Sequence, residues 1–405
     1  MIYSSIDIGS DTIKIVVARI SANSFDVLAS TSTHAVGIKK GMIVDKELAI
    51  KSITVALDEI EKQLGFRIDK AIITVPLYDM HVDIYNGLSY VEDKITGEDV
   101  ITCFKSSVST IDIDKEVVTV FPIDFLIDDK TRVYDPKGLT GNKLESRMLI
   151  SIVPKENVYD YLEVLEKCHV EVIDLSFGVI NDFYNMRENE DFLKGSGAVV
   201  DIGNDKTEIA IFNKGLMVDG VVMTSGSKLL DHDIGYIYHL DKTTSRILKE
   251  NLAMASSQYA DNSEVVEYEN ADGEKITINQ LEISQIVEAR LEELLKNVKK
   301  VLNSLTNREI SYIIITGGVT NLPGFDYLTR DIFGDVVTSI NMNTIGVRNN
   351  IYTSSVGMIK YYYDKLLIRG INYTMYEDIE KSIESKKSVI QDKLIDDIKK
   401  YLDNN

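Results

Sequence analysis

The chain has 405 residues, of which 44% are hydrophobic and 27% are charged, so its composition is that of a globular protein with two or three domains. It carries 44 basic and 64 acidic side chains, and the net charge of −20 disfavours binding to nucleic acid and disfavours resting the whole body on an anionic membrane. Two isolated cysteines, no Cys/His cluster, no signal-peptide pattern and no apolar run of about 18 residues predict a disulfide-free cytosolic protein without a structural zinc site or a membrane span.

A segment near the start of the chain has a second copy near its middle. Residues 7–17 have the sequence DIGSDTIKIVV, and residues 201–211 have the sequence DIGNDKTEIAI. Each copy predicts a strand, a tight turn at Asp-x-Gly and a second strand, and their separation predicts two related lobes. Both copies could be plain hairpin turns. A glycine turn can also present N–H groups to a phosphate beside a carboxylate that holds a cation or its water, so two facing hairpins would clasp a polyphosphate and Mg²⁺.

The first half of the chain also predicts a well-bounded helix and an insertion. Asp45 as N-cap, an apolar stripe and Gly65 at the end predict a helix between these two residues. Over residues 80–165 the pattern changes to short alternating strands and two helical stretches, which predicts a small α+β insertion. This insertion either binds partners or is a surface elaboration without a partner. The elements expected here are a buried strand at 71–76, strands at 115–122 and 147–153, and helices near 98–108 and 156–168.

The second half predicts three further features in chain order. Residues 260–275 are acidic and rich in turn formers, which indicates an exposed hairpin, and residues 283–305 have the longest helical pattern. Residues 312–325 predict an apolar strand followed by Gly317-Gly318, where a helix is expected to begin. A diglycine at such a junction admits close approach of a ligand to helix N-terminal amides, or is simply a loop that needs glycine.

The C-terminal segment KKSVIQDKLIDDIKKYLDNN predicts an amphipathic helix. Between Lys386 and Lys400 it has five lysines and three aspartates, so it is locally basic in an acidic protein. This pattern is typical of a helix on a membrane surface, and the lack of Trp and Phe predicts weak lipid affinity per copy, to which assembly would add avidity. A helix that binds a protein partner is the alternative. The residues expected to contact lipid are Ile390, Leu394, Ile398, Tyr401 and Leu402.

The two hairpins and the diglycine together resemble the actin, heat-shock-chaperone and sugar-kinase ATPase superfamily, with phosphate loops at 7–14 and 201–207. Over about residues 3–370 the chain is also similar to the FtsA family of bacterial cell-division proteins. The similar stretches are GIKKGMIVD (37–45), YDPKGLTGNKLESRML (134–149), SGSKLLDHDI (225–234) and ISQIVEARLEELL (283–295). The resemblance implies an α/β, actin-like bilobed ATPase fold of duplicated RNase H-like domains, with an inserted small α+β subdomain (1C, SHS2-like).

The same resemblance implies domain boundaries and partners. In the FtsA family, 1C contacts other protomers and division partners, the small subdomain 2B receives the C-terminal peptide of the tubulin-like protein FtsZ, and a C-terminal helix anchors the protein to the inner face of the membrane. The boundaries expected are 1–79 with 166–194 for 1A, 80–165 for 1C, 195–224 with 308–372 for 2A, 225–307 for 2B, and 373–405 for a linker and the C-terminal amphipathic helix.

The resemblance further implies an ATP and Mg²⁺ site. Asp7 and Asp201 would position Mg²⁺ and its water, with no protein atom bound directly to the metal. Glu288 is included because the matching helix of the superfamily edges the adenosine pocket, and a solvated face is the alternative. The residues expected to contact nucleotide are Gly9, Ser10, Asp11, Thr12, Lys14, Gly203, Asn204, Asp205, Lys206, Thr207, Gly226, Ser227, Glu288, Gly317, Gly318 and Val319.

The second phosphate loop departs from the successive glycines that are usual in the family. Asn204 and Asp205 tolerate a left-handed backbone, so the turn is expected to survive. The carboxylates of Asp205 and Asp11 would repel phosphates unless Mg²⁺ or Lys206 offsets them. We therefore expect nucleotide binding that depends steeply on Mg²⁺, with weak or absent hydrolysis.

The function expected from these features is a scaffold. An actin-like, ATP-binding protein would form filaments on the inner membrane face at the division site and anchor FtsZ filaments of the Z ring there. The alternatives are a sugar or small-molecule kinase of the same fold, for which the sequence offers no clear catalytic acid, and another bacterial actin-like protein of pilus assembly or plasmid segregation.

Overall fold

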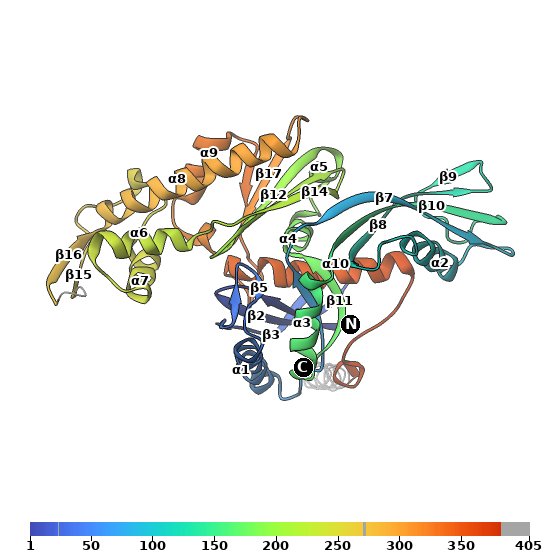
Figure 1. Ribbon diagram of the computed structural model, residues 1–405, viewed down its shortest axis with the longest axis horizontal. Helices are drawn as coiled ribbons and strands as arrows, with labels where there is room; N and C mark the ends of the chain where they lie inside the picture. The colour runs from blue at the N-terminus through green and yellow to red at the C-terminus, as the bar shows by residue number, and fades with distance from the viewer. Residues whose placement is uncertain (23, 270–272, 382–405) are drawn as a thin grey trace, which may run out of the picture.

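The computed structural model describes residues 1–22, 24–269 and 273–381, and two five-stranded sheets form the centres of its two lobes (Figure 1). In the first sheet, β1 runs antiparallel to β2, to which a tight turn joins it, and parallel to β6, which is reached through a crossover. The order is β11-β6-β1-β2-β3, made of β1 (Ile2–Ile8), β2 (Thr12–Ser21), β3 (Ser24–His34), β6 (Lys70–Val75) and β11 (Glu171–Phe177).

The second sheet repeats this topology. Its central strand β12 is antiparallel to β13 and parallel to β17, as β1 is to β2 and β6. The chain therefore has the duplicated, bilobed α/β architecture that the repeated hairpin predicts. The order is β14-β13-β12-β17-β18, made of β12 (Ser196–Ile202), β13 (Thr207–Asn213), β14 (Leu216–Met223), β17 (Tyr312–Thr316) and β18 (Val337–Ser339).

Helix α1 (Lys46–Leu64) covers the first sheet and begins and ends as its sequence predicts. The carboxylate of Asp45 accepts the N–H of Leu48 at 3.0 Å, and Gly65 ends the helix with a φ of 76°. Helix α3 (Glu156–Lys167) packs against α1, and a short hairpin of β4 (Ile38–Lys39) and β5 (Met42–Ile43) precedes α1.

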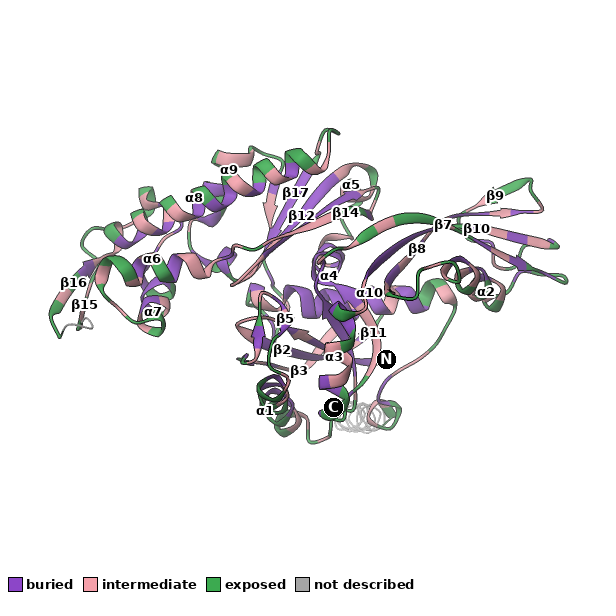
Figure 2. Ribbon diagram, viewed as in Figure 1, coloured by how far each residue is buried: buried purple, intermediate pink, exposed green. Residues whose placement is uncertain are grey.

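Two helices, α4 (Gly178–Met186) and α10 (Thr353–Arg369), pack against each other between the sheets. Helix α10 contacts β1, β2 and β6, whereas α4 contacts β11, β12 and β13. A side chain at Gly357 would overlap the carbonyl oxygen of Asn181, so glycine is required where the helices cross. One hydrophobic core continues from the first sheet through this pair to the near face of the second sheet, and both sheets are largely buried (Figure 2).

The insertion forms a separate antiparallel sheet with its own core, on the right in Figure 1. Helix α2 (Gly97–Val108) packs against β7 and β10 and begins with a capping box at Thr96. The strand order is β7-β10-β8-β9, made of β7 (His81–Tyr90), β8 (Lys115–Ile127), β9 (Thr131–Val133) and β10 (Lys143–Pro154). Strands β8 and β10 are longer than the alternating patterns predict.

The far face of the second sheet is covered by helices with a second core. The longest, α8 (Gln280–Leu305), packs against α6, α7 and α9. The hairpin expected at 260–275 is formed by β15 and β16, and its second strand lies a few residues later than predicted. The remaining elements are α5 (Glu190–Lys194), α6 (Lys228–Tyr238), α7 (Lys242–Leu252), β15 (Val265–Glu269), β16 (Lys275–Asn279) and α9 (Phe325–Phe333).

After α10 the chain returns to the first lobe, where residues 373–376, here called the strap, are bonded to the start of β1. The N–H of Ile2 donates to Oγ1 of Thr374 at 2.8 Å, and the N–H of Met375 donates to the carbonyl oxygen of Ile2 at 3.0 Å. The buried hydroxyl of Tyr376 donates to the carbonyl oxygen of Lys70 at 2.9 Å.

The expected lipid-contacting residues, Ile390, Leu394, Ile398, Tyr401 and Leu402, lie outside the described residues. Among the residues that are described, none of the helices has both the length and the apolar character needed to cross a bilayer.

Candidate functional site

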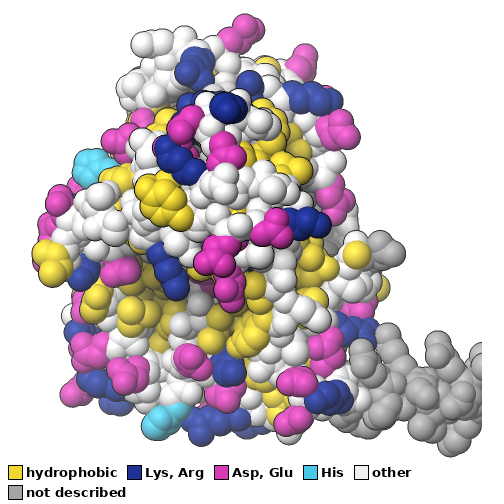
Figure 3. All heavy atoms as spheres, turned by 90° about the vertical axis from the view of Figure 1, so that its right-hand side faces the viewer, with side chains coloured by type: hydrophobic (Ala, Val, Ile, Leu, Met, Phe, Trp, Pro, Cys, Tyr) yellow, Lys and Arg dark blue, Asp and Glu magenta, His cyan; other side chains and the backbone are white. Residues whose placement is uncertain are grey.

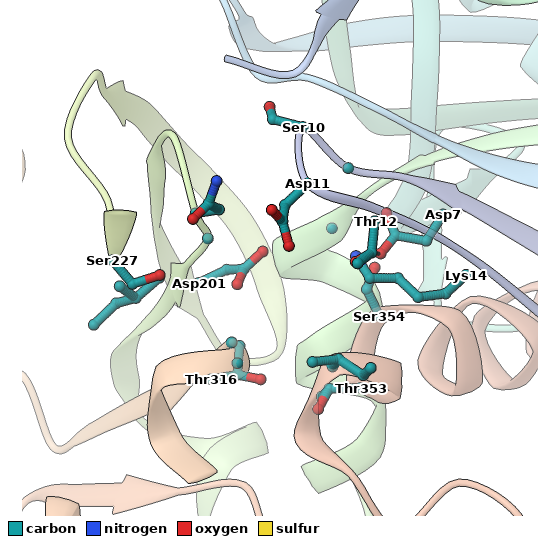
Figure 4. Close-up of a pocket in the computed structure, with 18 of the residues that line it drawn as sticks. Asp7, Ser10, Asp11, Thr12, Lys14, Asp201, Ser227, Thr316, Thr353 and Ser354 are labelled. Carbon is teal, nitrogen blue, oxygen red and sulfur yellow. Dashed lines mark hydrogen bonds and ion pairs between the residues drawn. The ribbon is translucent and has the colours of Figure 1, made fainter. Parts of the chain in front are cut away.

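A cavity of about 510 Å³ lies between the two lobes, where the β1–β2 turn and the β12–β13 turn face each other (Figure 4). Besides the turns, its walls come from the start of α4, from the segment 316–322 after β17, from residues 349–354 before and within α10, and from α7. The cavity is thus built by both halves of the duplication, and each half contributes the segment that the sequence repeats.

The two turns have the same geometry. The N–H of Gly9 donates to the carbonyl oxygen of Thr12 at 3.0 Å, and the N–H of Gly203 donates to that of Lys206 at 3.0 Å. A side chain at Gly9 would lie 2.9 Å from the Thr12 carbonyl oxygen, so close approach explains the glycine. The second turn forms without further glycines, as expected, and neither Asn204 nor Asp205 needs a positive φ in it.

Asp7 is held at the end of β1 by two donors. Lys14 Nζ lies 3.0 Å from Oδ2 of Asp7, and the Thr74 hydroxyl donates to Oδ1 at 2.9 Å. Burial acts to lower the pKa of Lys14, but the charges of Asp7, Asp201 and Asp11 outweigh it and raise this pKa above its ordinary value. Lys14 therefore remains a cation at the floor of the cavity.

Further carboxylates, from β12, β13 and α4, gather near Asp7 at the cavity. Burial, then the charges of Glu208 and Asp7, raise the pKa of Asp201 to about 7. Asp182 of α4 lines the same cavity, is 1% exposed, and has no hydrogen-bond partner for either oxygen among the described residues. Burial and the neighbouring carboxylates also raise its pKa well above the ordinary value. Like charges in one buried site disfavour full ionisation, so this cluster can bind protons or cations near neutral pH.

Asp205 has partners other than those that the sequence suggests. Its Oδ1 lies 2.7 Å from Lys228 Nζ, and its Oδ2 accepts the N–H of Lys40 from the first lobe at 3.2 Å. Although burial acts to raise it, these partners hold the pKa of Asp205 below its ordinary value. Lys206, one of the two groups that could offset this charge, pairs with Glu208 instead.

Asp11, the acidic residue of the first turn, is paired across the cavity. Arg246 Nη1 of α7 lies 2.5 Å from Oδ2 of Asp11, and Arg246 Nε lies 2.9 Å from Oε1 of Glu250. Figure 4 shows Asp11 projecting from the first turn into the space between the lobes. Both acidic side chains in the phosphate turns are therefore neutralised by cations of this chain.

The diglycine forms a third wall. Gly317 has a φ of 105°, and a side chain there would overlap the carbonyl oxygen of Ile202, so only glycine fits this junction. The prediction that an α-helix begins at the diglycine is wrong. Gly318 instead starts a short 3₁₀ turn that ends at Asn321, and α9 begins only at Phe325. The backbone after β17 still faces the cavity.

Most residues expected to contact nucleotide line this one cavity: Gly9, Ser10, Asp11, Thr12, Lys14, Gly203, Asn204, Asp205, Lys206, Ser227, Gly317, Gly318 and Val319, together with Asp7 and Asp201. Three others do not line it. Thr207 is buried and donates to the Ser225 carbonyl oxygen at 2.9 Å, and Gly226 packs on the backbone of the second turn. Glu288 accepts hydrogen bonds from Ser256 and Ser257.

Sequence reasoning missed several cavity residues. Asp182 had a usable signal, because an Asn-Asp pair interrupts an otherwise apolar helix that begins at Gly178. Arg246 and Lys249 lie in a highly charged helix in which no spacing marks them, and Lys249 is buried against Asp231 at 2.6 Å. Other missed residues are Thr74, Glu208, Glu250, Asn321, Asn349, Asn350, Thr353 and Ser354.

Comparison with known families identifies two segments. Residues 198–357 match the family model described as "Cell division protein FtsA", and residues 80–152 match "SHS2 domain inserted in FTSA". Among relatives, the chain is similar to cell division protein FtsA of Bacillus subtilis strain 168, with 27% identity over 395 residues that cover 96% of this chain and 90% of the relative. FtsA of Enterococcus hirae is 24% identical over 89% of this chain and 82% of the relative.

Solved structures share the fold at low identity. The PilM–PilN type IV pilus biogenesis complex matches with a TM-score of 0.59 and 13% identity, over 88% of this chain and 97% of that chain. MreB5 of Spiroplasma citri bound to ADP matches with a TM-score of 0.55 and 11% identity, over 91% and 98% of the two chains. EutJ of Carboxydothermus hydrogenoformans matches with a TM-score of 0.54 and 16% identity, over 89% and 90%. Together with the matched family segments, these findings show that the chain belongs to the FtsA family of cell-division proteins and has an actin-like ATPase fold with an inserted SHS2 domain.

Proposed function

We propose that this protein is an ATP-binding cell-division scaffold that assembles with itself and anchors FtsZ filaments to the cytoplasmic face of the membrane at the division site. The observation that carries the nucleotide part is the pair of glycine turns that face each other across one cavity, with the diglycine as a third wall. The family match favours the scaffold over a kinase or a pilus protein, because its relatives are named as cell-division proteins.

The residues of the cavity suit a nucleoside triphosphate with Mg²⁺. The turns at Gly9 and Gly203 leave backbone room for phosphates, and Lys14 supplies a buried positive charge. Asp7 and Asp201 would hold water of the Mg²⁺ shell, and the ion would neutralise phosphate charge when bound. The nucleoside would lie along Ser227 and the diglycine. Structures of the same fold, those of MreB5, were solved with ADP or AMPPNP, which supports this assignment.

The scaffold part is supported by surfaces outside the cavity. Figure 3 shows the end of the molecule that carries the insertion, where hydrophobic side chains gather in a hollow among charged ones. Exposed apolar side chains of the insertion include Tyr90, Ile113 and Tyr134, at 78%, 88% and 88% exposure. We assign self-association to this end and FtsZ binding to the region 225–307, where Tyr236 is 79% exposed.

Nucleotide binding is tested by titrating a fluorescent ATP analogue with Mg²⁺ and with EDTA. We expect the affinity to be about tenfold or more higher with Mg²⁺, because the cavity already contains several carboxylates that repel phosphate. We also expect slow or absent turnover.

The diglycine wall is tested by substitution. Gly317→Ala should weaken nucleotide binding about tenfold, since its side chain would displace the Ile202 backbone. Gly138→Ala is the matched control, because Gly138 also has a positive φ, of 81°, but lies away from the cavity. Tight metal-free binding, or equal effects of the two variants, would contradict the assignment.

Membrane anchoring is tested by sedimenting FtsZ filaments with anionic vesicles. The full chain should carry FtsZ into the vesicle pellet, whereas a chain that lacks residues 386–405 should leave it in the supernatant, because the apolar stripe and its lysines are then missing. Leu394→Asn, on the stripe, should weaken sedimentation, and Asp396→Glu, which at helical spacing lies opposite the stripe and keeps its charge, should not. Unchanged sedimentation of the truncated chain would show that the tail serves a protein partner instead.

A further inference from the structure

The lobes are joined at the cavity by an ion pair whose two side chains come from opposite halves of the chain. Asp11 lies in the β1–β2 turn of the first lobe, and Arg246 lies on α7 of the second, with 2.5 Å between Oδ2 and Nη1. Both residues line the cavity. The Asp11 side chain is 11% exposed and that of Arg246 is 37% exposed, so the pair is partly shielded from solvent. Such a pair resists separation of the lobes more strongly than a fully exposed one.

Arg246 is oriented for this contact by its own helix. Its Nε is bonded to Glu250, one turn further along α7, at 2.9 Å. The guanidinium thus faces two carboxylates at once, in the arrangement that suits its fixed fork of donors. Helix α7 packs on α6 and α8 within the second lobe, so Arg246 links that packed unit to the turn of the first lobe.

Two other contacts that join the β12–β13 hairpin of the second lobe to the first lobe have backbone donors. The N–H of Lys40 donates to Asp205 at 3.2 Å, and the N–H of Leu77 donates to Glu208 at 3.2 Å. These bonds connect the β12–β13 hairpin to the first lobe, whereas the Asp11–Arg246 pair involves two side chains that can rotate apart without any change of backbone. The pair can therefore open while these backbone bonds stay in place.

We propose that the Asp11–Arg246 ion pair is a gate that sets how fast nucleotide leaves the cavity, an inference that rests on the proposed nucleotide binding. Opening of the gate rotates the two side chains apart and exposes the phosphate side of the cavity. The gate is a property of the two residues together. Removing either partner opens it, and removing both has no further effect.

The competing explanation is that Arg246 acts alone as a phosphate ligand. In that case Arg246→Gln would speed dissociation, but Asp11→Asn would slow it or leave it unchanged, because the substitution frees the guanidinium from a competing carboxylate. The two explanations therefore predict opposite results for Asp11→Asn.

The test is a chase experiment on the full-length protein. A fluorescent ATP analogue with Mg²⁺ is bound to saturation, excess ATP is added, and the dissociation rate is measured for the unchanged chain, Asp11→Asn, Arg246→Gln and the double variant. We expect dissociation to be about three- to tenfold faster in each single variant, as for the loss of a partly buried ion pair, and no faster in the double variant.

Arg19→Gln is the matched control. It breaks the Arg19–Asp26 pair at 2.7 Å, in which both partners belong to the β2–β3 hairpin of the first lobe, and should leave the rate unchanged. Thermal unfolding of each variant separates misfolding from gating. As a measurement without substitution, raising the salt concentration should speed dissociation more in the unchanged chain than in Arg246→Gln, because the pair is screened only where it exists.

Three results overturn the gate: slower or unchanged dissociation in Asp11→Asn, additive effects in the double variant, or equal salt dependence with and without Arg246. If the unchanged chain binds no nucleotide in the loading step, the proposed function fails as well. The loading step thus separates a failure of the proposed function from a failure of the gate alone.

Discussion

Three aspartates that line the cavity differ in whether their charge is balanced by a neighbouring cation. Asp205 and Asp11, which the sequence marks as repulsive to phosphate, are each paired with a cation of this chain. Asp182, which the sequence did not mark, has no partner for its carboxylate among the described residues. The unbalanced acidity of the cavity therefore lies deeper than the turns, on α4 and at Asp201.

This acidity predicts how stability depends on pH. In the folded protein burial raises the pKa of Asp182 and Asp201, the latter to about 7, whereas unfolded aspartates ionise near pH ~4. The folded state thus holds these protons more tightly, and the free energy of unfolding falls as pH rises from about 4 to about 7, where Asp201 ionises. Asp182→Asn removes one of these protonated carboxyls. It should therefore reduce the fall in the free energy of unfolding between pH 5 and pH 8 by on the order of 1 kcal/mol, measured by urea unfolding.

The control for this prediction is Asp331→Asn on α9, where the aspartate is exposed. It should leave the pH dependence of stability unchanged. An Asp182→Asn protein whose stability falls with pH as steeply as that of the unchanged chain would show that Asp182 does not store a proton in the folded state.

Among the secondary-structure elements, those governed by local signals were predictable. Helix α1 begins and ends as expected, because Asp45 and Gly65, which cap it, act on the adjacent backbone and need no distant partner. The end of β17 was predictable, but the 3₁₀ turn after it was not, because the φ of 105° at Gly317 reflects its contact with β12. Elements whose ends depend on a distant strand or helix cannot be bounded from local sequence.

The crossing of α4 and α10 is the element contact most sensitive to side-chain size. Gly357→Ala would place a methyl group on the Asn181 carbonyl oxygen, so the helices must separate. Because this pair belongs to the core that joins both sheets, we expect a loss of about 2–4 kcal/mol in the free energy of unfolding, measured by chemical denaturation. Gly178→Ala on α4 is the control, since its side chain would have 3.4 Å to the nearest atom, and it should cost under about 1 kcal/mol. Equal losses for both variants would show that the crossing tolerates an extra methyl group.

Across the whole molecule, the duplication was visible in the sequence because the repeated turns need the same glycine and the same hydrogen bond. The placement of one lobe against the other was not visible. It depends on Arg246, Lys40 and Leu77, which meet partners of the other lobe more than 100 residues away. The cavity residues on the turns could therefore be named from the sequence, whereas Arg246 and Lys249 on α7 could not.

The strap also has a mechanical consequence. It is bonded to Ile2 at the first residue of β1, and the same strand carries Asp7 and ends at Ile8, directly before the Gly9 turn. A pulling force on the chain beyond residue 381 would thus enter the body through the strap at the start of β1. Seven residue pairs tie β1 to β2, so a force directed along the strand would load these pairs in shear together rather than peel them open one at a time. Tension on the tail would therefore reach the strand that ends at the phosphate turn.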